Sequence, residues 1–159
     1  MTDIPDQDVT QLVHRLIQRG LTIATAESLT GGLVCATLVN VPGASNTVRG
    51  GICTYATDLK ASVLGVSPDR LALSGPVVQQ VAEQMAAGVR TLLNADIGVS
   101  TTGVAGPGAL DGRPAGTVHC ACVTPARTWH RLLHLSGSRD QIRHLTVKEA
   151  LGLVAHALE

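Results

Sequence analysis

The apolar run LTIATA (residues 21–26) limits what this chain can fold into more than any other segment. It is short, rich in β-branched side chains and uncharged, which is typical of a strand buried in a sheet. Residues 7–19 precede it with apolar side chains at helical spacing, and Asp6 is the expected N-cap of that helix. A glycine pair follows the run and opens a helix of small residues at about 33–39. Helix, strand, turn and helix is therefore the predicted local order.

The remainder of the chain continues to alternate between strand and helix patterns. The next predicted elements are a loop at 41–51 (VPGASNTVRGG), a strand at 52–57 (ICTYAT), a short helix at 58–66 (DLKASVLGV) and another short helical piece at Pro68 to Arg70. A longer helix is predicted from Pro76, in its first turn, to about Asn94, with one apolar face made of Val78, Val81, Met85, Val89, Leu92 and Leu93. The last predicted elements are a strand through about Thr101, a Gly- and Pro-rich loop, a β-hairpin of TVHCACVTP and TWHRLLHLSG, and a helix at 141–158.

This order predicts the fold class, an α/β protein. Strands that alternate with helices, followed by one late hairpin, predict a three-layer α/β/α arrangement around a mixed, mostly parallel sheet. The 159 residues fit a single domain, 1–159, large enough to bury a core without disulfides or metal. Ligands bind such sheets beyond the carboxyl ends of the strands, so AESLTGGL (26–33) and TTGVAGPGA (101–109) are the candidate binding loops.

The composition of the chain limits the kinds of molecule that it is expected to bind. Twelve basic residues balance twelve acidic ones, and the chain has one Trp, one Tyr and no Phe, so neither charge nor base-stacking side chains favour nucleic acid. No apolar run reaches the roughly 20 residues of a membrane span, and the polar, acidic N-terminus is unlike a signal peptide. A cytoplasmic location is expected, with no membrane partner. Hydrophobic residues make up 45% of the chain and charged residues 15%, which favours either an unusually buried α/β sheet or an oligomer with extra covered surface.

The cysteines and histidines give no strong metal signal. The four cysteines, Cys35, Cys53, Cys120 and Cys122, are expected to be reduced, since a cytoplasmic domain with an adequate core needs no disulfides. The Cys-x-Cys spacing is narrower than that of usual zinc sites, so no metal is expected. His130 and His134 form a second candidate ligand pair, but a solvated strand face is the preferred interpretation.

Ser28 and Lys60 are the residues most suited to chemistry. A serine after a buried strand, close to backbone N–H groups at the start of a helix, can act as a nucleophile or simply as an N-cap. A nucleophile needs a base, and Lys60 is one of only two lysines. A buried lysine of lowered pKa takes a serine proton, whereas a solvated lysine on a short helix does nothing chemical. The segments alone leave both alternatives open.

Two further features suggest an anion site. Arg139 and Arg143 lie at the start of the last predicted helix, where guanidinium groups and the helix N-terminus together suit a phosphate. Arginines on an exposed helix face are also commonplace. The GVAGPG stretch has the glycine content of a phosphate loop but lacks a Gly-Lys-Ser/Thr ending, which argues against a Walker-type nucleotide site.

Five segments taken together resemble the successive motifs of the CinA C-terminal domain family. They are TAESLTGG, GGICTYATDLKASVLGV, STTGVAGPGA, RPAGTVHCACV and SGSRDQIR, in unbroken order over almost the whole chain. The resemblance implies the activity of the stand-alone members, which hydrolyse the carboxamide of nicotinamide mononucleotide to nicotinic acid mononucleotide and ammonia. It implies no metal and no organic cofactor, a small-molecule nucleotide as substrate, and a homodimer.

The resemblance also implies roles for individual residues. Ser28 matches the family's nucleophile, Lys60 its partner and Tyr55 the tyrosine at the catalytic site. Glu27 is expected to orient the loop. The residues expected to bind substrate are Glu27, Thr30, Gly31, Thr102, Gly103, Ala105, Gly106, Arg139 and Arg143, the two arginines near the phosphate.

Several positions depart from the family pattern. Leu29 replaces the cysteine of the usual AESCTGG, which affects packing beside the serine rather than chemistry. Val78 and Gln79 replace a hydroxyl and an acid, and Ser138 replaces an aspartate. The alternative function is a non-catalytic nucleotide-binding or protein-interaction module, linked to competence or the DNA-damage response.

Overall fold

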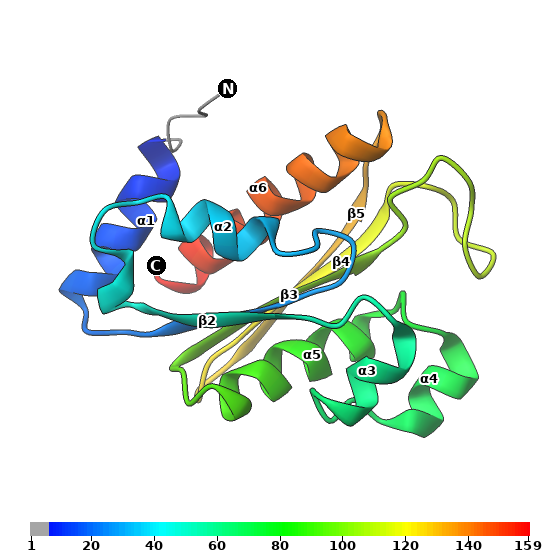
Figure 1. Ribbon diagram of the computed structural model, residues 1–159, viewed down its shortest axis with the longest axis horizontal. Helices are drawn as coiled ribbons and strands as arrows, with labels where there is room; N and C mark the ends of the chain where they lie inside the picture. The colour runs from blue at the N-terminus through cyan, green and yellow to red at the C-terminus, as the bar shows by residue number, and fades with distance from the viewer. Residues whose placement is uncertain (1–6) are drawn as a thin grey trace.

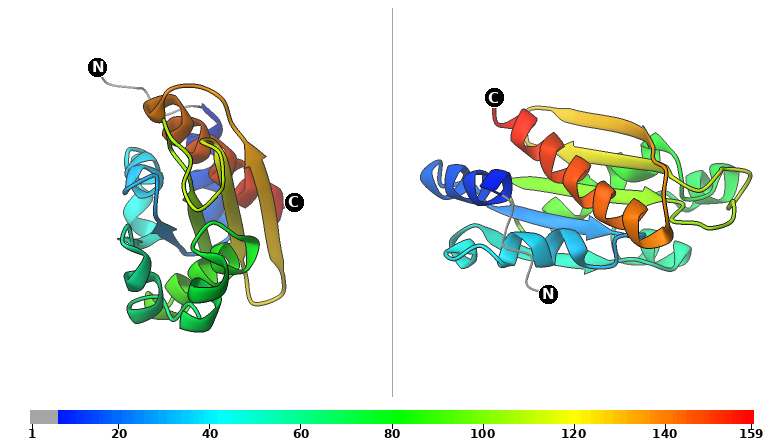
Figure 2. Two further views of the ribbon diagram at one scale, coloured as in Figure 1. Left: turned by 90° about the vertical axis from the view of Figure 1, so that its right-hand side faces the viewer. Right: turned by 90° about the horizontal axis from the view of Figure 1, so that it is seen from above.

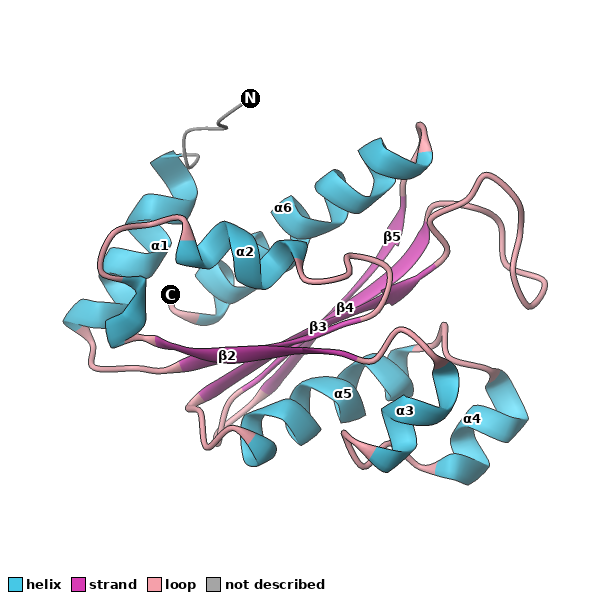
Figure 3. Ribbon diagram, in the orientation of Figure 1, coloured by secondary structure: helices cyan, strands magenta, loops and turns pink. Residues whose placement is uncertain are grey.

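The computed structural model describes residues 7–159, so the expected cap Asp6 lies outside the described residues. A five-stranded sheet lies between two layers of helices, with α1, α2 and α6 on one face and α3, α4 and α5 on the other (Figures 1 and 3). The strands are β1 (Ile23–Glu27), β2 (Val48–Cys53), β3 (Ile97–Gly103), β4 (Thr117–Val123) and β5 (Thr128–His134). The helices are α1 (Gln7–Gln18), α2 (Leu33–Val39), α3 (Thr57–Ser62), α4 (Pro68–Ser74), α5 (Gln79–Leu92) and α6 (Arg139–Ala157), with a 3₁₀ turn at Ala44–Asn46.

The strand order is β2-β1-β3-β4-β5. β1 is parallel to both β2 and β3, while β4 is antiparallel to β3 and to β5, so that every strand except β4 runs in the same direction. The predicted three-layer fold and the late hairpin are therefore confirmed. The carboxyl ends of β1, β2 and β3 meet at one edge of the sheet, because these three strands are parallel neighbours.

The core occupies both sides of the sheet. On one side, α1, α2 and α6 pack on β-strand residues such as Ile97, Val99 and Val118. The view from above in Figure 2 shows these three helices lying across the same face. On the other side, α5 packs on the small residues Ala24 and Ala26 of β1. Every residue of β1 is buried, as its apolar sequence predicts for a strand covered on both faces.

The structure shifts several predicted boundaries. The second strand is Val48–Cys53, so four of the eleven residues of the predicted loop at 41–51 belong to the strand, and the predicted strand at 52–57 begins and ends too late. Gly51 is needed for packing rather than for a turn: a Cβ there would lie 2.5 Å from the Thr25 hydroxyl and 2.9 Å from the Cβ of Cys35. Helix α5 begins at Gln79, not in the turn of Pro76.

The cysteine thiols are free, and Cys120 and Cys122 are buried, where desolvation raises the pKa of each to about 12. The solvated strand face expected for the histidine pair holds only for His134. The His130 ring is half-buried, and its Nε2 lies 2.8 Å from Nδ1 of buried His119, with the two rings stacked. Burial and the neighbouring His130 lower the pKa of His119 to about 4. Across residues 7–159, no helix is long and apolar enough to span a bilayer.

Candidate active site

A cavity of about 390 Å³ opens at the carboxyl ends of the parallel strands. The loop after β1 contributes Ser28 and Leu29, the segment after β2 contributes Tyr55, and α3 contributes Thr57 and Lys60. The loop after β3 forms another wall, and the first residue of α6 completes the rim. A larger groove of about 550 Å³ lies between α1, α2 and α6. The smaller cavity is the candidate active site because it holds the buried serine and lysine.

Ser28 and Lys60, 32 residues apart in sequence, are in direct contact. Lys60 Nζ lies 3.0 Å from Ser28 Oγ and donates a second hydrogen bond to the carbonyl of Thr54 at 2.6 Å. The Lys60 side chain is 1% exposed and Ser28 is 9% exposed. The backbone N–H of Ser28 donates to the Thr101 carbonyl at 3.1 Å, which continues the β1–β3 pairing past the end of the strand. The serine is thus held at the sheet edge with its hydroxyl toward the lysine.

Burial makes the Lys60 amine easier to deprotonate than an exposed lysine. Burial lowers its pKa from 10.5 to about 8, and the nearby Asp58 opposes this shift only in part. At a pKa of about 8, about one amine in ten is neutral at pH 7. The free electron pair of the neutral amine can accept the proton of a hydroxyl that is hydrogen-bonded to it. Of the two alternatives left open by the sequence, a buried lysine is the one that the structure shows.

The Glu27 carboxylate holds the start of helix α2. Its carboxylate accepts hydrogen bonds from the backbone N–H groups of Gly32 (2.9 Å), Val34 (3.0 Å) and Cys35 (2.8 Å), and from the Thr25 hydroxyl at 3.2 Å. It therefore caps the first turn of α2, whose orphan donors and positive end suit a carboxylate. Glu27 does not line the cavity, which differs from its expected place among the substrate-binding residues. The sequence allowed Ser28 to be the N-cap of this helix, but the capping side chain is Glu27.

Thr30, Gly31 and Arg143 form or contact the loop directly after Ser28, outside the cavity. The Thr30 hydroxyl lies 2.8 Å from the Thr101 hydroxyl, and the Gly31 N–H donates to the Ser28 carbonyl at 3.1 Å. Arg143 donates from Nε to the Leu29 carbonyl at 2.9 Å and from Nη2 to the Thr30 carbonyl at 3.2 Å. None of these three predicted substrate-binding residues lines the cavity. In particular, Arg143 contacts protein carbonyls at a point where a phosphate contact was expected.

The remaining predicted residues lie on the cavity wall, and they are Tyr55, Thr102, Gly103, Ala105, Gly106 and Arg139. Arg139 donates from Nη1 to the Gly106 carbonyl at 2.7 Å and from Nη2 to the Tyr55 hydroxyl at 3.0 Å. The Thr102 hydroxyl donates to the Pro76 carbonyl at 2.9 Å, which leaves its oxygen as an acceptor. Arg139 thereby links two loops at the rim and brings a positive charge there.

Sequence reasoning missed part of this wall. Pro76, Val77 and Leu110 also line the cavity. They come from the segment before α5 and from the loop after β3, and the Gly and Pro content of both segments was the only signal available. The Thr54 carbonyl, which holds Lys60, is a backbone group that no side-chain pattern reveals.

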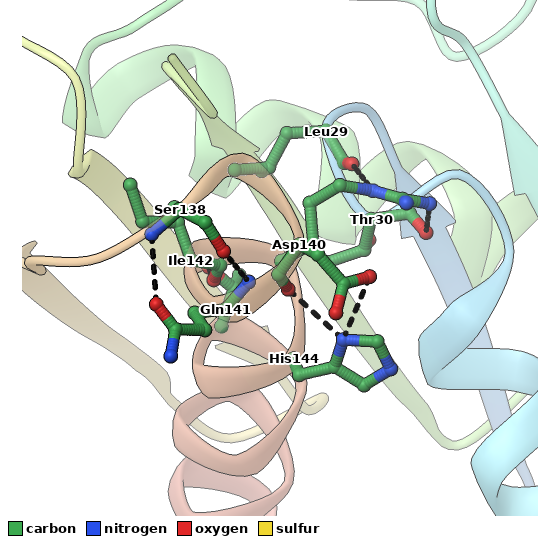
Figure 4. Close-up of polar contacts among 9 residues, drawn as sticks. Leu29, Thr30, Ser138, Asp140, Gln141, Ile142 and His144 are labelled. Carbon is green, nitrogen blue, oxygen red and sulfur yellow. Dashed lines mark hydrogen bonds and ion pairs between the residues drawn. The ribbon is translucent and has the colours of Figure 1, made fainter. Parts of the chain in front are cut away.

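The start of α6 sets the positions of both arginines. Ser138 accepts a hydrogen bond from the Gln141 N–H at 3.2 Å, and its own N–H donates to Gln141 Oε1 at 2.8 Å. This capping box begins the helix at Arg139, so Arg139 and Arg143 lie one turn apart on one face. Figure 4 shows the capping box and, facing the first turns of α6, the carbonyl groups of Leu29 and Thr30.

Comparisons with known proteins agree with the fold and with the family that the sequence resembles. The CinA C-terminal domain family matches residues 6–158. A CinA-like protein of Frankia casuarinae is 49% identical over 143 residues, which cover 90% of this chain and 33% of the relative. A putative competence-damage inducible protein of Caldanaerobacter subterraneus is 42% identical over 158 residues, 98% of this chain and 38% of the relative. The chain thus spans 33% to 38% of the length of these relatives.

Solved structures match along the whole chain. The competence/damage inducible protein CihA of Agrobacterium tumefaciens has a TM-score of 0.89 at 36% identity and covers 99% of each chain. A competence-damaged protein (CinA) superfamily protein of Klebsiella pneumoniae has a TM-score of 0.93 at 30% identity and covers 98% of each chain.

Proposed function

Because this chain belongs to the CinA C-terminal domain family, we propose that it is an amidohydrolase that converts nicotinamide mononucleotide to nicotinic acid mononucleotide and ammonia. One observation carries the proposal: the buried Lys60 Nζ lies 3.0 Å from Ser28 Oγ at the wall of a cavity with a cationic rim. A serine with a base in hydrogen-bond reach is the arrangement of a nucleophilic acyl-transfer site. The reaction serves pyridine-nucleotide salvage.

The mechanism passes through an acyl-enzyme. Neutral Lys60 takes the proton of Ser28 as Oγ attacks the carboxamide carbon, which forms a tetrahedral intermediate. The C–N bond then breaks, Lys60 returns the proton to the leaving nitrogen, and ammonia departs from a Ser28 ester. In the second half a water molecule gives a proton to Lys60 and attacks the ester carbon. The carboxylic acid leaves and Ser28 recovers its proton.

A backbone N–H group beside Ser28 supplies the oxyanion site. The Ser28 N–H donates to the Thr101 carbonyl and the Gly31 N–H to the Ser28 carbonyl, so neither is available to substrate. The N–H groups of Leu29 and Thr30 donate no hydrogen bond to any part of residues 7–159. Leu29 lines the cavity whereas Thr30 is fully buried outside it, so we assign the Leu29 N–H as the donor to the oxyanion. Loss of one such donor typically costs about 3 to 4 kcal/mol of transition-state stabilisation.

The rim binds the nucleotide portion. Arg139 is the first residue of α6, where a guanidinium and the N-terminal end of a long helix combine in favour of an anion. It is the residue we assign to the phosphate. Tyr55 lies beside it with an exposed ring, and Thr102 with the Gly103 to Gly106 backbone borders the carboxamide end near Ser28.

Ammonia release from nicotinamide mononucleotide tests the assignment. The wild-type protein is compared with Ser28→Ala, Lys60→Ala and Lys148→Ala, the last a matched control because Lys148 is the only other lysine and is exposed on α6. Activity is expected in the wild type and the control alone. Equal activity in all four proteins would refute the serine-lysine mechanism.

The second candidate is a non-catalytic nucleotide-binding or interaction module, which the names of the competence-damage inducible relatives favour. Binding of the nucleotide by calorimetry with no ammonia release by the wild type would support it. We also propose a homodimer, in keeping with the 45% hydrophobic composition, and light scattering on the purified protein measures it.

A further inference from the structure

Thr102 lies beside Ser28 at the carboxyl edge of the sheet. Glu27 of β1 pairs with Thr101 of β3 in parallel register, and the Ser28 N–H donates to the Thr101 carbonyl at 3.1 Å. The next step of this register places Thr102 next to Ser28, at about the 4.8 Å that separates neighbouring strands. Both residues line the candidate active-site cavity.

The side chains of Ser28 and Thr102 also point to the same face of the sheet. Ser28 Oγ lies 3.0 Å from Lys60 Nζ on α3, and the Thr102 hydroxyl donates at 2.9 Å to a carbonyl just before α5. Helices α3 and α5 cover one face (Figure 1). When Ser28 Oγ attacks a carboxamide carbon, the C–N bond of about 1.3 Å and a hydrogen bond of about 2.9 Å bring the nitrogen within reach of the Thr102 oxygen.

The partner of the Thr102 hydroxyl fixes its polarity. A carbonyl only accepts hydrogen bonds, so the single hydroxyl proton is used on the carbonyl of Pro76. What this leaves for a ligand is an oxygen that accepts but does not donate. A carboxamide brings an NH₂ donor to such an oxygen, whereas an ionised carboxylate brings only acceptors. Thr102 is 1% exposed, so solvent does little to weaken this contrast.

The groups around Thr102 make the contrast important. At a pKa of about 8, about nine Lys60 amines in ten are charged at pH 7, and a charged amine attracts the carboxylate of the product. The cavity wall next to Thr102 is apolar, with the buried side chains of Val77, Val104 and Ala105. These side chains offer no hydrogen bond to either form of the ligand. Thr102 thus favours the amide at the point where charged Lys60 favours the acid.

We propose that Thr102 is a specificity-determining residue that favours the carboxamide substrate over the carboxylate product, by accepting a hydrogen bond from the NH₂ group. The inference rests on the proposed amidohydrolase function and deepens it. Water attacks the Ser28 ester from the side that ammonia vacated, so the second carboxylate oxygen takes the place of the nitrogen against the Thr102 oxygen. The product therefore loses the hydrogen bond that held the substrate, and this loss promotes its release.

Binding of the amide and of the acid is compared in a Ser28→Ala background, which cannot form the ester. Calorimetry gives the ratio of the Kd of nicotinic acid mononucleotide to the Kd of nicotinamide mononucleotide. Thr102→Val keeps the shape of the side chain and removes the oxygen. It is expected to weaken the amide about tenfold and strengthen the acid about threefold, which lowers the ratio about 30-fold. Thr102→Ser restores the hydroxyl and is expected to restore the ratio to within about threefold.

Thr101→Val is the matched control. The Thr101 hydroxyl belongs to the preceding residue of β3, lies 2.8 Å from the Thr30 hydroxyl and does not line the cavity. The control loses a buried hydrogen bond, as Thr102→Val does when it leaves the Pro76 carbonyl unpaired, so thermal melts of the two variants compare the cost to folding. The control is expected to keep the ratio within about threefold of the parent protein.

A third ligand makes the test independent of the folding of Thr102→Val. The 3-acetylpyridine analogue of the nucleotide has a methyl group in place of NH₂, and it is expected to bind about tenfold less tightly than the amide when Thr102 is intact. Equal binding of these two ligands would overturn the role of Thr102. An unchanged ratio in a folded Thr102→Val variant would do the same.

The proposed function is judged separately, by ammonia release from nicotinamide mononucleotide by the wild type. Release of ammonia together with either contrary binding result leaves the proposed function standing and overturns the role of Thr102 alone. Binding of both nucleotides without ammonia release overturns the proposed function, and the Kd ratio still decides the role of Thr102. Absence of both binding and ammonia release overturns both proposals.

Discussion

Below pH 8, the amidase activity is expected to fall about tenfold for each pH unit, because only neutral Lys60 accepts the Ser28 proton. Burial lowers the pKa of Lys60 from 10.5 to about 8. At pH 7 about one molecule in ten then carries the neutral amine, and above pH 8 the activity reaches a plateau. The profile of kcat/KM between pH 6 and 9 reports this titration in the free enzyme.

The same titration changes the stability of the fold. The folded-state pKa of about 8 lies below the unfolded value of 10.5, so the unfolded chain binds more protons between these limits and stability rises with pH across that window. Below pH 8 the buried Lys60 amine is charged in the folded protein, so burial of this charge destabilises the fold by its full amount. At about 1.4 kcal/mol per pKa unit, the shift of the Lys60 pKa from 10.5 to about 8 corresponds to about 3 kcal/mol of lost folding stability.

Lys60→Met removes the cost of burying a charged amine, and it also removes the hydrogen bonds of Lys60 to Ser28 and Thr54. Those two bonds are worth about 1 kcal/mol each, so the inactive variant is expected to be more stable than the wild type by about 1 kcal/mol at pH 7. Above pH 10.5 it is expected to be less stable by about 2 kcal/mol. Urea unfolding of both proteins across this range measures the change, with Lys148→Met as the control for a surface lysine.

Two results would refute this reasoning. A kcat/KM profile that is flat from pH 6 to 9 would mean that Lys60 is not the base, or that its pKa is not lowered. A difference in unfolding free energy between wild type and Lys60→Met that stays constant with pH would mean that burial does not penalise the charged amine.

Three further predictions concern Ser28, Glu27 and Arg139. Ser28→Ala is expected to lower ammonia release by more than about 1,000-fold with an unchanged circular dichroism spectrum, and residual activity within tenfold of wild type would exclude Ser28 as the nucleophile. Glu27→Gln places an amide NH₂ among three backbone donors of α2 and is expected to destabilise the fold by about 2 to 4 kcal/mol in urea unfolding. A change below about 0.5 kcal/mol would show that the cap is dispensable. Arg139→Gln is expected to raise KM at least tenfold for nicotinamide mononucleotide but not for nicotinamide riboside, which lacks the phosphate; an equal effect on both would place the phosphate elsewhere.

Most elements were predictable because their signals are local. The helical spacing before Gly20, the apolar run of β1, the small-residue helix α2 and the late hairpin each depend on neighbours in sequence, and all four are present in the structure. The second strand was misplaced because its glycines suggest a loop. Gly51 is required by the close approach of Thr25 and Cys35, which come from another strand and from a helix.

The amino-acid sequence by itself determined the fold class, the family and the identity of the candidate pair Ser28 and Lys60. Only the tertiary structure decided what several polar residues do. The carboxylate of Glu27 caps α2, and Arg143 holds the carbonyls after Ser28 although Arg139, the same residue type one turn earlier, faces the cavity. The physical reason is that motifs specify residue types along the chain, whereas hydrogen-bond partners and burial are set by segments that the sheet brings together from distant positions.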